Sequence, residues 1–528
     1  MVLSAVGFVA SCQRSTPIEA GFRESRLLVG NGIEPSSLDP HTNTGSAESS
    51  IISALFDPLI DWNDTATGFV PAAAERWTVS PDGLVYTFYL RKDARWSNGD
   101  AVTAQDWLLS LRRFVKPSVA AELAYMAYDV VGVEDFNQGR SADPTALGFA
   151  APDDHTLVLT LRAPNADFLG RLTAYPWLPL HIPSVTAAGG MARPDSDFTR
   201  PGKLISNGAY RLTAWLPNQY VEVTRNPYFR TPPGIESLRF FPLESLDTEE
   251  RAYRSGQLHI TSGIPAHKIE GYREADDPAL HVTSRVGIRY LITNVRRAPF
   301  DDGRVRRALA LAIDRKQLAE AVLRTGEAPA YAFIGPIHGG YTPTALLDES
   351  IAEARRLLAA AGYPDGQGFP AVEYLYNSND RNRDVAEALQ QMWRSALNIT
   401  VTLRNEEWKV FLDSRNRGDF QLARSGWLPW TPEPIGLYEQ VVSDSGTNDT
   451  GWGNARFDAL FWEARRTLDS APRYALYQQM DEILRDEMPV IPLAYYSVAR
   501  LVHPRVRGWP DNPLEAFTWR SIRFGEMP

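Results

Sequence analysis

Two hydrophobic periodicities alternate along most of the chain. Runs in which every second side chain is apolar, as at 85–90, predict strands, and apolar side chains spaced by three and four residues, as at 383–397, predict helices. The predicted strands are 27–30, 85–90, 153–161, 207–215, 220–227, 256–260, 289–294, 372–376, 399–404 and 491–499. The predicted helices are 46–56, 249–255, 304–313, 351–361, 383–397 and 473–485.

The order of these elements indicates the fold class. Strands and helices alternate through the second half of the chain, which is typical of an α/β domain. The first half instead contains a strand-rich segment. A predicted helix interrupts this segment, with Thr103 as its N-cap and Asp106 in the capping-box position. The pattern therefore predicts an α/β protein with a strand-rich insertion and without internal repeats.

Residues 420–434 concentrate side chains that suit a ligand site. The stretch begins as a strand and becomes a loop with three prolines, which lack the backbone N–H of a ladder. At the transition stand Arg424, Gly426, Trp427 and Trp430. Arginine offers a fork for a carboxylate, glycine admits a close backbone approach, and tryptophan offers a large rigid face. A strand end with core tryptophans and a solvated arginine is the competing interpretation.

Composition narrows the classes of protein to which the chain could belong. With 528 residues, 44% of them hydrophobic, the chain can build more than one domain. A net charge of −10 argues against a nucleic-acid binder, which would present a basic face. The 14 tryptophans fit an aromatic ligand cleft, although a large core also uses tryptophan.

The N-terminus has the features of a secretory signal. An apolar run ends in Val9-Ala10-Ser11-Cys12, the pattern of a bacterial lipobox, and residues 13–25 are polar and small like a tether. Cys12 is the only cysteine, so an internal disulfide and a cysteine-built zinc site are excluded. We expect lipidation of Cys12 and an extracytoplasmic, periplasmic location; a fortuitous apolar N-terminus is the alternative.

Motifs of catalysis are missing from the sequence. It contains no His-Glu-x-x-His, no Gly-x-Ser-x-Gly and no P-loop, and its eight histidines are scattered. An enzyme therefore has no positive support in the sequence beyond its aromatic richness, and no cofactor or metal is predicted.

A series of ordered motifs carries a family resemblance. They are Pro-Ser-Ser-Leu-Asp-Pro-His at 35–41, Ala-Glu-Arg-Trp at 74–77, Tyr-Thr-Phe-Tyr-Leu-Arg-Lys-Asp-Ala-Arg-Trp-Ser-Asn-Gly at 86–99, Val-Thr-Ala-Gln-Asp at 102–106, Asn-Gly-Ala-Tyr at 207–210, Tyr-Arg-Ser-Gly at 253–256, Phe-Asp-Asp-Gly-Arg-Val-Arg at 300–306 and Glu-Trp-Lys at 407–409. Together they resemble the oligopeptide-binding proteins of bacterial ABC importers, the extracytoplasmic solute-binding protein family 5, from about residue 26 to the C-terminus.

The resemblance implies a two-lobed periplasmic binding protein fold with a hinge and an extra subdomain on the first lobe. Residues 1–25 would form the signal and tether. Lobe I would consist of residues 26–56, 181–285 and 498–528, with residues 57–180 as its extra subdomain. Lobe II would consist of residues 286–497. Hinge strands are expected near 285–290 and 494–500. The implied protein is a tethered monomer that encloses a peptide or peptide-like solute and delivers it to the ABC permease subunits of the inner membrane.

The resemblance also implies a site in which an extended peptide pairs its backbone with protein strands. The first-lobe strand corresponds to Thr44-Gly45-Ser46 and the second-lobe strand to Gly426-Trp427-Leu428. The candidate pocket walls are Trp408, Trp427, Tyr495 and Tyr496. The candidate contacts to peptide carboxylates are Arg415, Arg424 and Asn382, the last standing where the family has a histidine.

The chain departs from the family pattern at position 430. The family holds the peptide ammonium with the aspartate of Gly-Trp-x-x-Asp, but this chain has Trp430, and Thr44 replaces a second family acid. A buried ammonium without a counter-charge costs several kcal/mol, so a ligand without a free amino terminus is expected unless Glu433 or Asp413 compensates. Gly287 and Leu428 stand where some members have a cysteine pair.

Three functions are therefore compared. The first is an importer's binding protein for an oligopeptide or for a blocked or non-peptide solute. A non-transport ligand sensor or chaperone-like surface protein is the second, and an extracytoplasmic hydrolase is the third.

Overall fold

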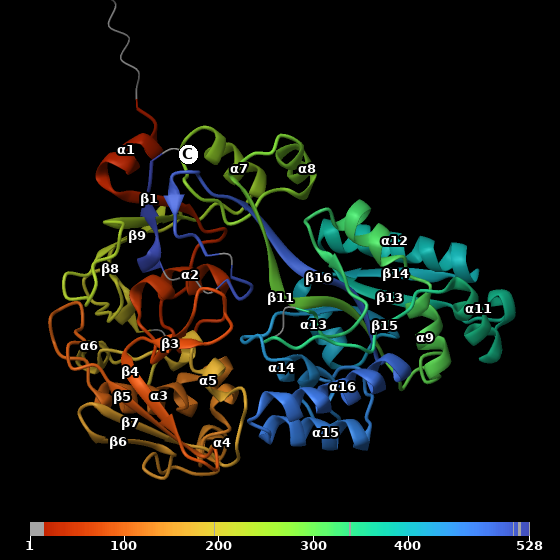
Figure 1. The fold of residues 1–528 in the computed structure, drawn as a ribbon, viewed down its shortest axis with the longest axis horizontal. Helices are drawn as coiled ribbons and strands as arrows, with labels where there is room; N and C mark the ends of the chain where they lie inside the picture. Colours follow the sequence, from red (N-terminus) through yellow and green to blue (C-terminus); the bar gives the residue numbers. More distant parts are fainter. Residues whose placement is uncertain (1–14, 195, 337–338, 511, 516–518, 527–528) are drawn as a thin grey trace, which may run out of the picture.

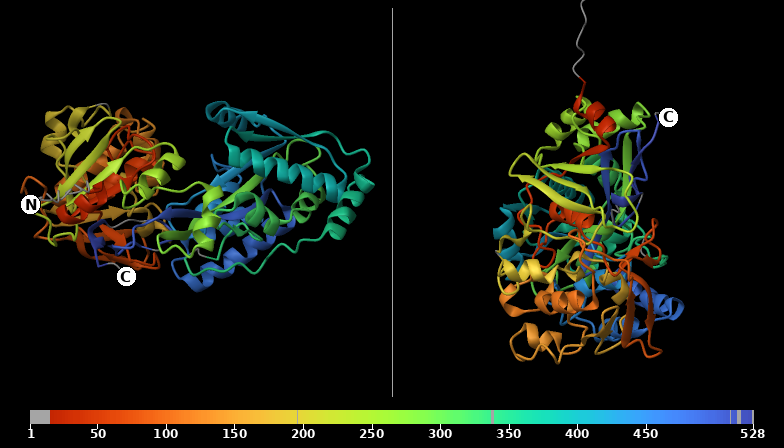
Figure 2. Two further views of the ribbon diagram at one scale, coloured as in Figure 1. Left: turned by 90° about the horizontal axis from the view of Figure 1, so that it is seen from above. Right: turned by 90° about the vertical axis from the view of Figure 1, so that its left-hand side faces the viewer.

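The polypeptide forms two lobes that Figure 1 shows side by side and Figure 2 shows joined by a narrow waist. The computed structural model describes residues 15–194, 196–336, 339–510, 512–515 and 519–526. The predicted lipid site, Cys12, lies outside the described residues. Each lobe has its own sheet and core, so the predicted two-lobed α/β fold is confirmed.

The first lobe is built on a sheet with the strand order β1-β10-β9-β8, in which β1 and β10 are parallel. Alternate side chains such as Leu27, Val223 and Leu238 enter a core that α2 closes with Ile51 and Leu55. The elements here are α1 (Pro17–Glu24), β1 (Arg26–Gly30), α2 (Ser46–Leu55), α6 (Ile182–Ala187), β8 (Tyr210–Leu216), β9 (Tyr220–Arg225), β10 (Ser237–Phe241), α7 (Leu246–Arg254), α8 (Ala266–Glu274), β17 (Val506–Arg507) and β18 (Arg523–Phe524).

A strand-rich subdomain interrupts this lobe and forms its lower part in Figure 1. Its antiparallel sheet, β4-β5-β7-β6, buries Phe88 and Leu157 against Trp107 of α3. The predicted capping box begins α3: the Asp106 backbone N–H donates to the Thr103 hydroxyl, and the Thr103 N–H donates to the Asp106 carboxylate. The elements are β2 (Ile60–Trp62), β3 (Phe69–Pro71), β4 (Ala74–Val79), β5 (Val85–Leu90), α3 (Ala104–Phe114), α4 (Val133–Asn137), β6 (Phe149–Asp153), β7 (Thr156–Thr160) and α5 (Phe168–Arg171).

The second lobe has a sheet of order β12-β16-β11-β15-β13-β14 with cores on both faces. Strand β13 is parallel to β14 and β15, and the other neighbours are antiparallel. Leu422 enters the core beneath α9, α11 and α12, while the adjacent Ala423 enters the core beneath α14, α15 and α16. The elements are β11 (Leu280–Thr293), α9 (Gly303–Leu311), α10 (Arg315–Gln317), β12 (Ala328–Pro329), α11 (Ile351–Ala360), β13 (Val372–Asn377), α12 (Asp380–Leu397), β14 (Val401–Glu406), α13 (Trp408–Asn416), β15 (Leu422–Trp427), α14 (Ile435–Tyr438), α15 (Ala455–Arg466), α16 (Ser470–Glu487) and β16 (Val490–Leu501).

Two long antiparallel strands, β11 and β16, run from one lobe into the other (Figure 1). Residues 280–284 pair with 497–501, where the Leu501 carbonyl accepts the Thr261 N–H of the first lobe. Residues 288–292 pair with 490–495 inside the second-lobe sheet. The register shifts between Ser284 and Ile288, so the ladder is interrupted within the segment predicted as the hinge.

One predicted element is wrong. Residues 256–260 form no strand; of these residues only Ile260 makes isolated bridges, to Val29 and Val502. Leu258 and Ile260 are both buried in hydrophobic cores. Their spacing gives the alternation of apolar and polar residues that is typical of a strand, although the segment does not pair as one.

A buried carboxyl that has no ion-pair partner among the described residues stabilises the second lobe in a pH-dependent way. Asp481 on α16 accepts hydrogen bonds from the hydroxyls of Tyr341 (2.7 Å) and Tyr438 (2.9 Å). Burial raises the pKa of Asp481 to about 7. Because the folded state binds this proton more tightly than the unfolded chain does, the stabilisation is complete below about pH 4 and is lost as the pH rises through about 7.

We predict that the free energy of unfolding falls between pH 5 and pH 8 by on the order of 2 kcal/mol through this group alone. Asp481→Asn removes the titration and keeps the shape, so the variant should lose less stability over the same interval. Urea unfolding of both proteins at both pH values measures the difference. Equal losses in the two proteins would contradict the assignment.

Candidate ligand-binding cleft

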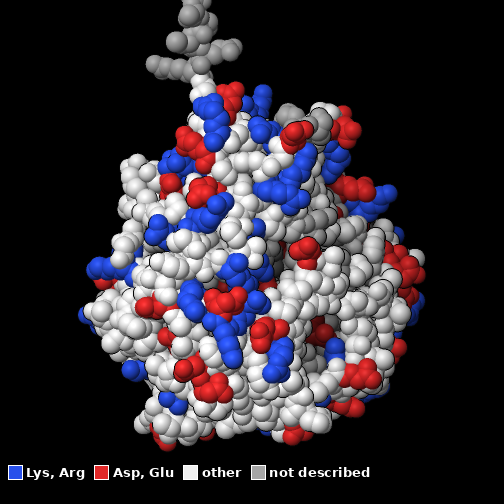
Figure 3. Space-filling model, turned by 60° about the vertical axis from the view of Figure 1, so that its left-hand side comes forward, with Lys and Arg blue, Asp and Glu red and all other residues white. Residues whose placement is uncertain are grey.

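A cavity of about 440 Å³ lies between the lobes. Its first-lobe wall includes Thr44, Gly45 and Ser46 at the start of α2, and its second-lobe wall includes Leu428 and Trp430 after β15. The first predicted segment therefore lines this cavity completely, and the second, Gly426-Trp427-Leu428, lines it only with Leu428. On the face shown in Figure 3, basic and acidic side chains are interspersed rather than separated.

The first-lobe segment is not the strand that the resemblance implied. Thr44 and Gly45 form an extended loop, Gly45 caps α2, and Ser46 is its first helical residue. The Asn43 side chain accepts the Gly45 N–H (2.8 Å) and donates to the Gly45 carbonyl (3.3 Å). These bonds engage the backbone groups that a peptide would need at Gly45, so strand pairing there stays a prediction that requires the Asn43 bonds to be exchanged for those of the ligand.

Glu48, in the first turn of α2, is a nearby acid that the sequence did not reveal. Its Oε1 accepts the Ser36 N–H (2.8 Å) and hydroxyl (3.0 Å). Its buried Oε2 has no hydrogen-bond partner among the described residues and lies against Gly45, since a Cβ at Gly45 would be 2.1 Å from it. In the sequence, an acid in the first turn of a helix indicates only a favourable interaction with the helix dipole.

The second-lobe segment offers an unpaired strand edge. Strand β15 pairs with β11 over its whole length, from Leu422 to Trp427, but with β13 only at Leu422 and Ala423. Between residues 424 and 427 the edge away from β11 therefore has no partner strand among the described residues. An extended ligand can add to such an edge.

Neighbouring residues of β15 point to opposite faces of the sheet. Arg424 and Gly426 share one face, and Trp427 packs against the core on the other. A Cβ at Gly426 would lie 2.1 Å from the Tyr496 hydroxyl oxygen. A larger residue at position 426 would thus overlap the Tyr496 side chain. This contact is a second reason for a glycine here, besides the close approach of a ligand backbone that the sequence suggested.

The three side chains predicted to bind a peptide carboxylate differ in how far other residues already occupy them. The Arg424 Nε is buried without a hydrogen-bond partner among the described residues, and burial, opposed mainly by Tyr496, lowers the Arg424 pKa. Arg415 is already paired with Asp449 (Nε to Oδ2, 2.8 Å). The buried Asn382 donates to the Asn377 side chain (2.9 Å). Arg424 is therefore the predicted arginine that has no ion-pair partner among the described residues.

The predicted pocket walls are only partly brought together. Trp408 is exposed, stacks on Phe411 and does not line the cavity. Tyr495 is not a wall, because it is buried in the second-lobe core with its hydroxyl donating to the Ala332 carbonyl (2.8 Å). Tyr496, on the opposite face of β16, lies beside Gly426.

Trp430 lies at the contact between the lobes. Trp430 is 36% exposed and meets Tyr175 of the first lobe edge-to-face at 5.3 Å. Gly287 and Leu428 are also neighbours, because a Cβ at Gly287 would be 2.6 Å from Leu428 Cδ2. Leu428 occupies the space that the absent Gly287 side chain leaves.

The carboxylates that line the cavity are neutralised by arginines. Among the described residues they are Asp57, Asp61 and Glu515. Asp57 pairs with Arg230 and Arg520. Asp61 also pairs with Arg520, and Glu515 pairs with Arg285. The two acids considered as substitutes at position 430 are paired as well, Glu433 with Arg473 (3.0 Å) and Asp413 with Arg417 (3.0 Å).

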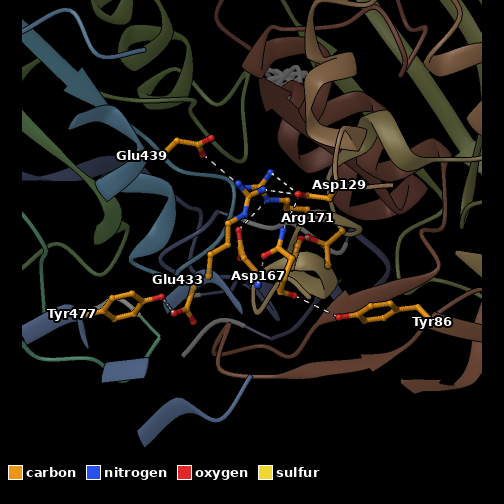
Figure 4. A network of polar contacts seen from close by, with 11 residues as sticks. Tyr86, Asp129, Asp167, Arg171, Glu433, Glu439 and Tyr477 are labelled. Carbon is orange, nitrogen blue, oxygen red and sulfur yellow. Dashed lines mark hydrogen bonds and ion pairs between the residues drawn. The ribbon is translucent and has the colours of Figure 1, made fainter. Parts of the chain in front are cut away.

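An interlobe ion-pair network joins the strand-rich subdomain to the second lobe (Figure 4). Arg465 of α15 contacts Asp129 at 2.7 and 2.8 Å, and Arg171 of α5 lies 3.7 Å from Glu439. Burial raises the pKa of the adjoining Asp167 to about 6, against the attraction of Arg171. The network links the two lobes at a contact that does not involve the strands β11 and β16.

Comparisons with known proteins agree with this geometry. Residues 68–449 match the family described as bacterial extracellular solute-binding proteins, family 5 Middle. The chain belongs to this family. Its relatives are binding proteins and not enzymes.

Three family members illustrate the range of ligands. The periplasmic oligopeptide-binding protein OppA of Escherichia coli (strain K12) is 33% identical over 96% of this chain and 94% of its own. The probable deoxycholate-binding periplasmic protein YgiS of the same strain is 32% identical over 97% and 95%. The solved structure of the murein tripeptide-binding protein MppA of Escherichia coli, unliganded and open, superposes with a TM-score of 0.82 at 30% identity over 95% and 97%.

The described residues show neither a metal-binding cluster nor a membrane-spanning helix. They contain no cluster of three or more His, Cys, Asp or Glu side chains arranged to hold a metal ion. None of their helices combines the length and the apolar composition needed to cross a membrane.

We predict that Gly426→Ala destabilises the protein by about 1–3 kcal/mol, because the new methyl overlaps the Tyr496 hydroxyl. The Tyr496 Cζ is farther from the position of this methyl, at 3.2 Å. Gly426→Ala should therefore cost clearly less in a Tyr496→Phe background. Thermal unfolding of the four proteins in this cycle gives the coupling, and an equal cost in both backgrounds would contradict the contact.

Proposed function

We propose that the protein is the solute-binding component of an ABC importer and encloses a peptide-like solute between its lobes for delivery to a membrane permease. The main support is the unpaired edge of β15 at residues 424–427, which opens beside the partner-free Nε of Arg424. An extended peptide would pair its backbone with this edge and direct a carboxylate to the arginine.

Ligand access requires the lobes to separate, and closure requires motion about β11 and β16. We assign lobe I to residues 26–56, 181–285 and 498–528, its extra subdomain to 57–180 and lobe II to 286–497. The register shift between Ser284 and Ile288 supports this assignment because an interrupted ladder bends more easily than a continuous one. Opening must break the Asp129–Arg465 pair, which therefore favours the closed arrangement.

A solute without a free amino terminus is the second candidate. It is favoured by Trp430 in the ammonium position and by the arginine partners of the cavity carboxylates. The relative described as a probable deoxycholate-binding protein supports the same class, because deoxycholate is an acid without an amine. Glu48 is the acid that would replace the family aspartate if an ammonium were bound.

We predict that Ala-Ala-Ala and its N-acetyl form bind with affinities within about fivefold of each other, since no charge pair is lost on acetylation. Calorimetry measures both affinities, and small-angle scattering should show a smaller radius of gyration with bound peptide. A loss of a hundredfold or more on acetylation would instead indicate ammonium recognition. Absence of binding by both forms, together with binding of deoxycholate, would favour the non-peptide solute.

The contribution of Trp430 is tested with a matched tryptophan. Trp430→Ala should weaken binding by about 1–3 kcal/mol through lost aromatic contact. Trp408→Ala, which removes an exposed tryptophan outside the cavity, should leave the affinity unchanged. Equal effects of the two substitutions would exclude a specific role of Trp430.

We further propose that Cys12 is lipidated and tethers the protein to a membrane, as its position after Val9-Ala10-Ser11 suggests. Cys12→Ser should move the protein from the membrane fraction to the soluble fraction. Fractionation of cells expressing either form, with mass spectrometry of the N-terminal peptide, checks this. A soluble native protein with an unmodified Cys12 would contradict it.

A further inference from the structure

Arg424 belongs to a group of arginines that exceeds the carboxylates around it. The group, here called the arginine basin, consists of Arg289 on β11, Arg381 on α12 and Arg424 on β15, with Glu327 as its carboxylate. The Arg289 guanidinium lies 5.1 Å from the centre of the Tyr496 ring, and the Tyr496 hydroxyl lies against Gly426. The basin therefore adjoins the unpaired edge of β15.

The hydrogen bonds of the basin leave donors unused. Arg289 is only 5% exposed; it lies 3.5 Å from Glu327 and donates to the Asn382 amide oxygen at 3.3 Å, while its Nε has no partner among the described residues. Arg381 and Arg424 make no hydrogen bond or ion pair within the described part of the chain. Glu327 pairs with Arg289, and Arg381 and Arg424 have no ion-pair partner among the described residues, so positive charge exceeds negative charge in the basin.

Such an arrangement destabilises the ligand-free protein. Burial is the main cause that lowers the pKa of Arg381 and of Arg424, and repulsion from Arg289 adds to it in both. Half-buried cations of the same sign are costly unless an anion neutralises them. A folded protein that keeps three of them together is therefore prepared for an anionic group from outside.

The position of the basin in the fold suits a ligand. It lies where the parallel strands β13 and β15 end and α12 begins, and ligands of α/β sheets bind at the carboxyl ends of the strands. The positive end of the dipole of α12, an 18-residue helix, is at this site and favours an anion further.

The alternation of β15 decides which part of a ligand reaches the basin. Arg424 and Gly426 face the basin, and Ser425 and Trp427 face away. A ligand that pairs with this edge directs every second side chain to the same face of the extended sheet. A side chain can thus meet the basin while the ligand's backbone remains paired with β15.

We propose that the arginine basin is a subsite for an acidic side group of the solute, so that the preferred ligand carries a carboxylate or similar anion in addition to any terminal carboxylate. This inference rests on the proposed function, because it takes the solute to be bound along β15. It identifies the solute as an anionic, peptide-like molecule.

The affinities of matched peptides test the subsite. The probes are N-acetylated tripeptides of alanine with a single glutamate at position 1, 2 or 3, each compared by calorimetry with the glutamine peptide of the same position. We expect the glutamate peptide to bind about tenfold or more tightly than its glutamine counterpart at one position. Equal or weaker binding of the glutamate peptide at all three positions, while the glutamine peptides bind, would overturn the subsite and leave the proposed function intact. Absence of binding by every peptide would overturn both.

Variants of Arg381 distinguish a ligand subsite from a structural role. Arg381→Gln should reduce the preference for glutamate to about threefold or less and at the same time raise the melting temperature of the ligand-free protein, because it removes a repelled charge. Arg383→Gln is the matched control, since Arg383 lies on the same helix, is exposed and pairs with Asp380 at 3.1 Å. Its preference should stay unchanged. A lower melting temperature of Arg381→Gln with an unchanged glutamate preference would show that Arg381 is structural and would overturn the proposal.

Discussion

The pairing of β11 with β16 is the constraint on which the rest of the molecule depends. These two strands cross between the lobes, form the middle of the second-lobe sheet and reach the first lobe at Leu501. Their ladder shifts in register between Ser284 and Ile288, at the crossing between the lobes, and again between Arg289 and Tyr290 inside the second-lobe sheet. The pairing therefore keeps the lobes together while leaving one place where bending costs few hydrogen bonds.

The same strands position the candidate site. Strand β15 pairs with β11 on one side, so its other edge becomes available where β13 diverges after Ala423. Arg289 on β11 and Tyr496 on β16 then stand beside Gly426 and Arg424. Hinge and site share their backbone, and a ligand on β15 is consequently held against the strands about which the lobes would move.

Charge is distributed unequally between the two sides of the cleft. In the cavity between the lobes the acids are paired with arginines, whereas the arginine basin keeps an excess of positive charge. A binding site with this distribution attracts anionic groups and gives little compensation to an ammonium. Trp430 fits that distribution, since it replaces a charge by an aromatic contact with Tyr175.

The fold class, most strands and helices, and the family can be predicted from the amino-acid sequence alone. Periodicity reports which side of an element is buried, and the ordered motifs reflect a shared architecture, as the capping box at Thr103 and the strand at 422–427 illustrate. Periodicity failed at 256–260, where loop residues are buried, and the family resemblance failed at Thr44–Ser46, which forms a loop and the start of α2 instead of a strand. Packing alone reveals that Arg415 is neutralised by Asp449, that Glu48 Oε2 lacks a partner among the described residues, and that Arg289, Arg381 and Arg424 come from three distant segments. The physical reason is that the state of a charge depends on partners brought together by packing, and their separation along the chain carries no sign of that contact.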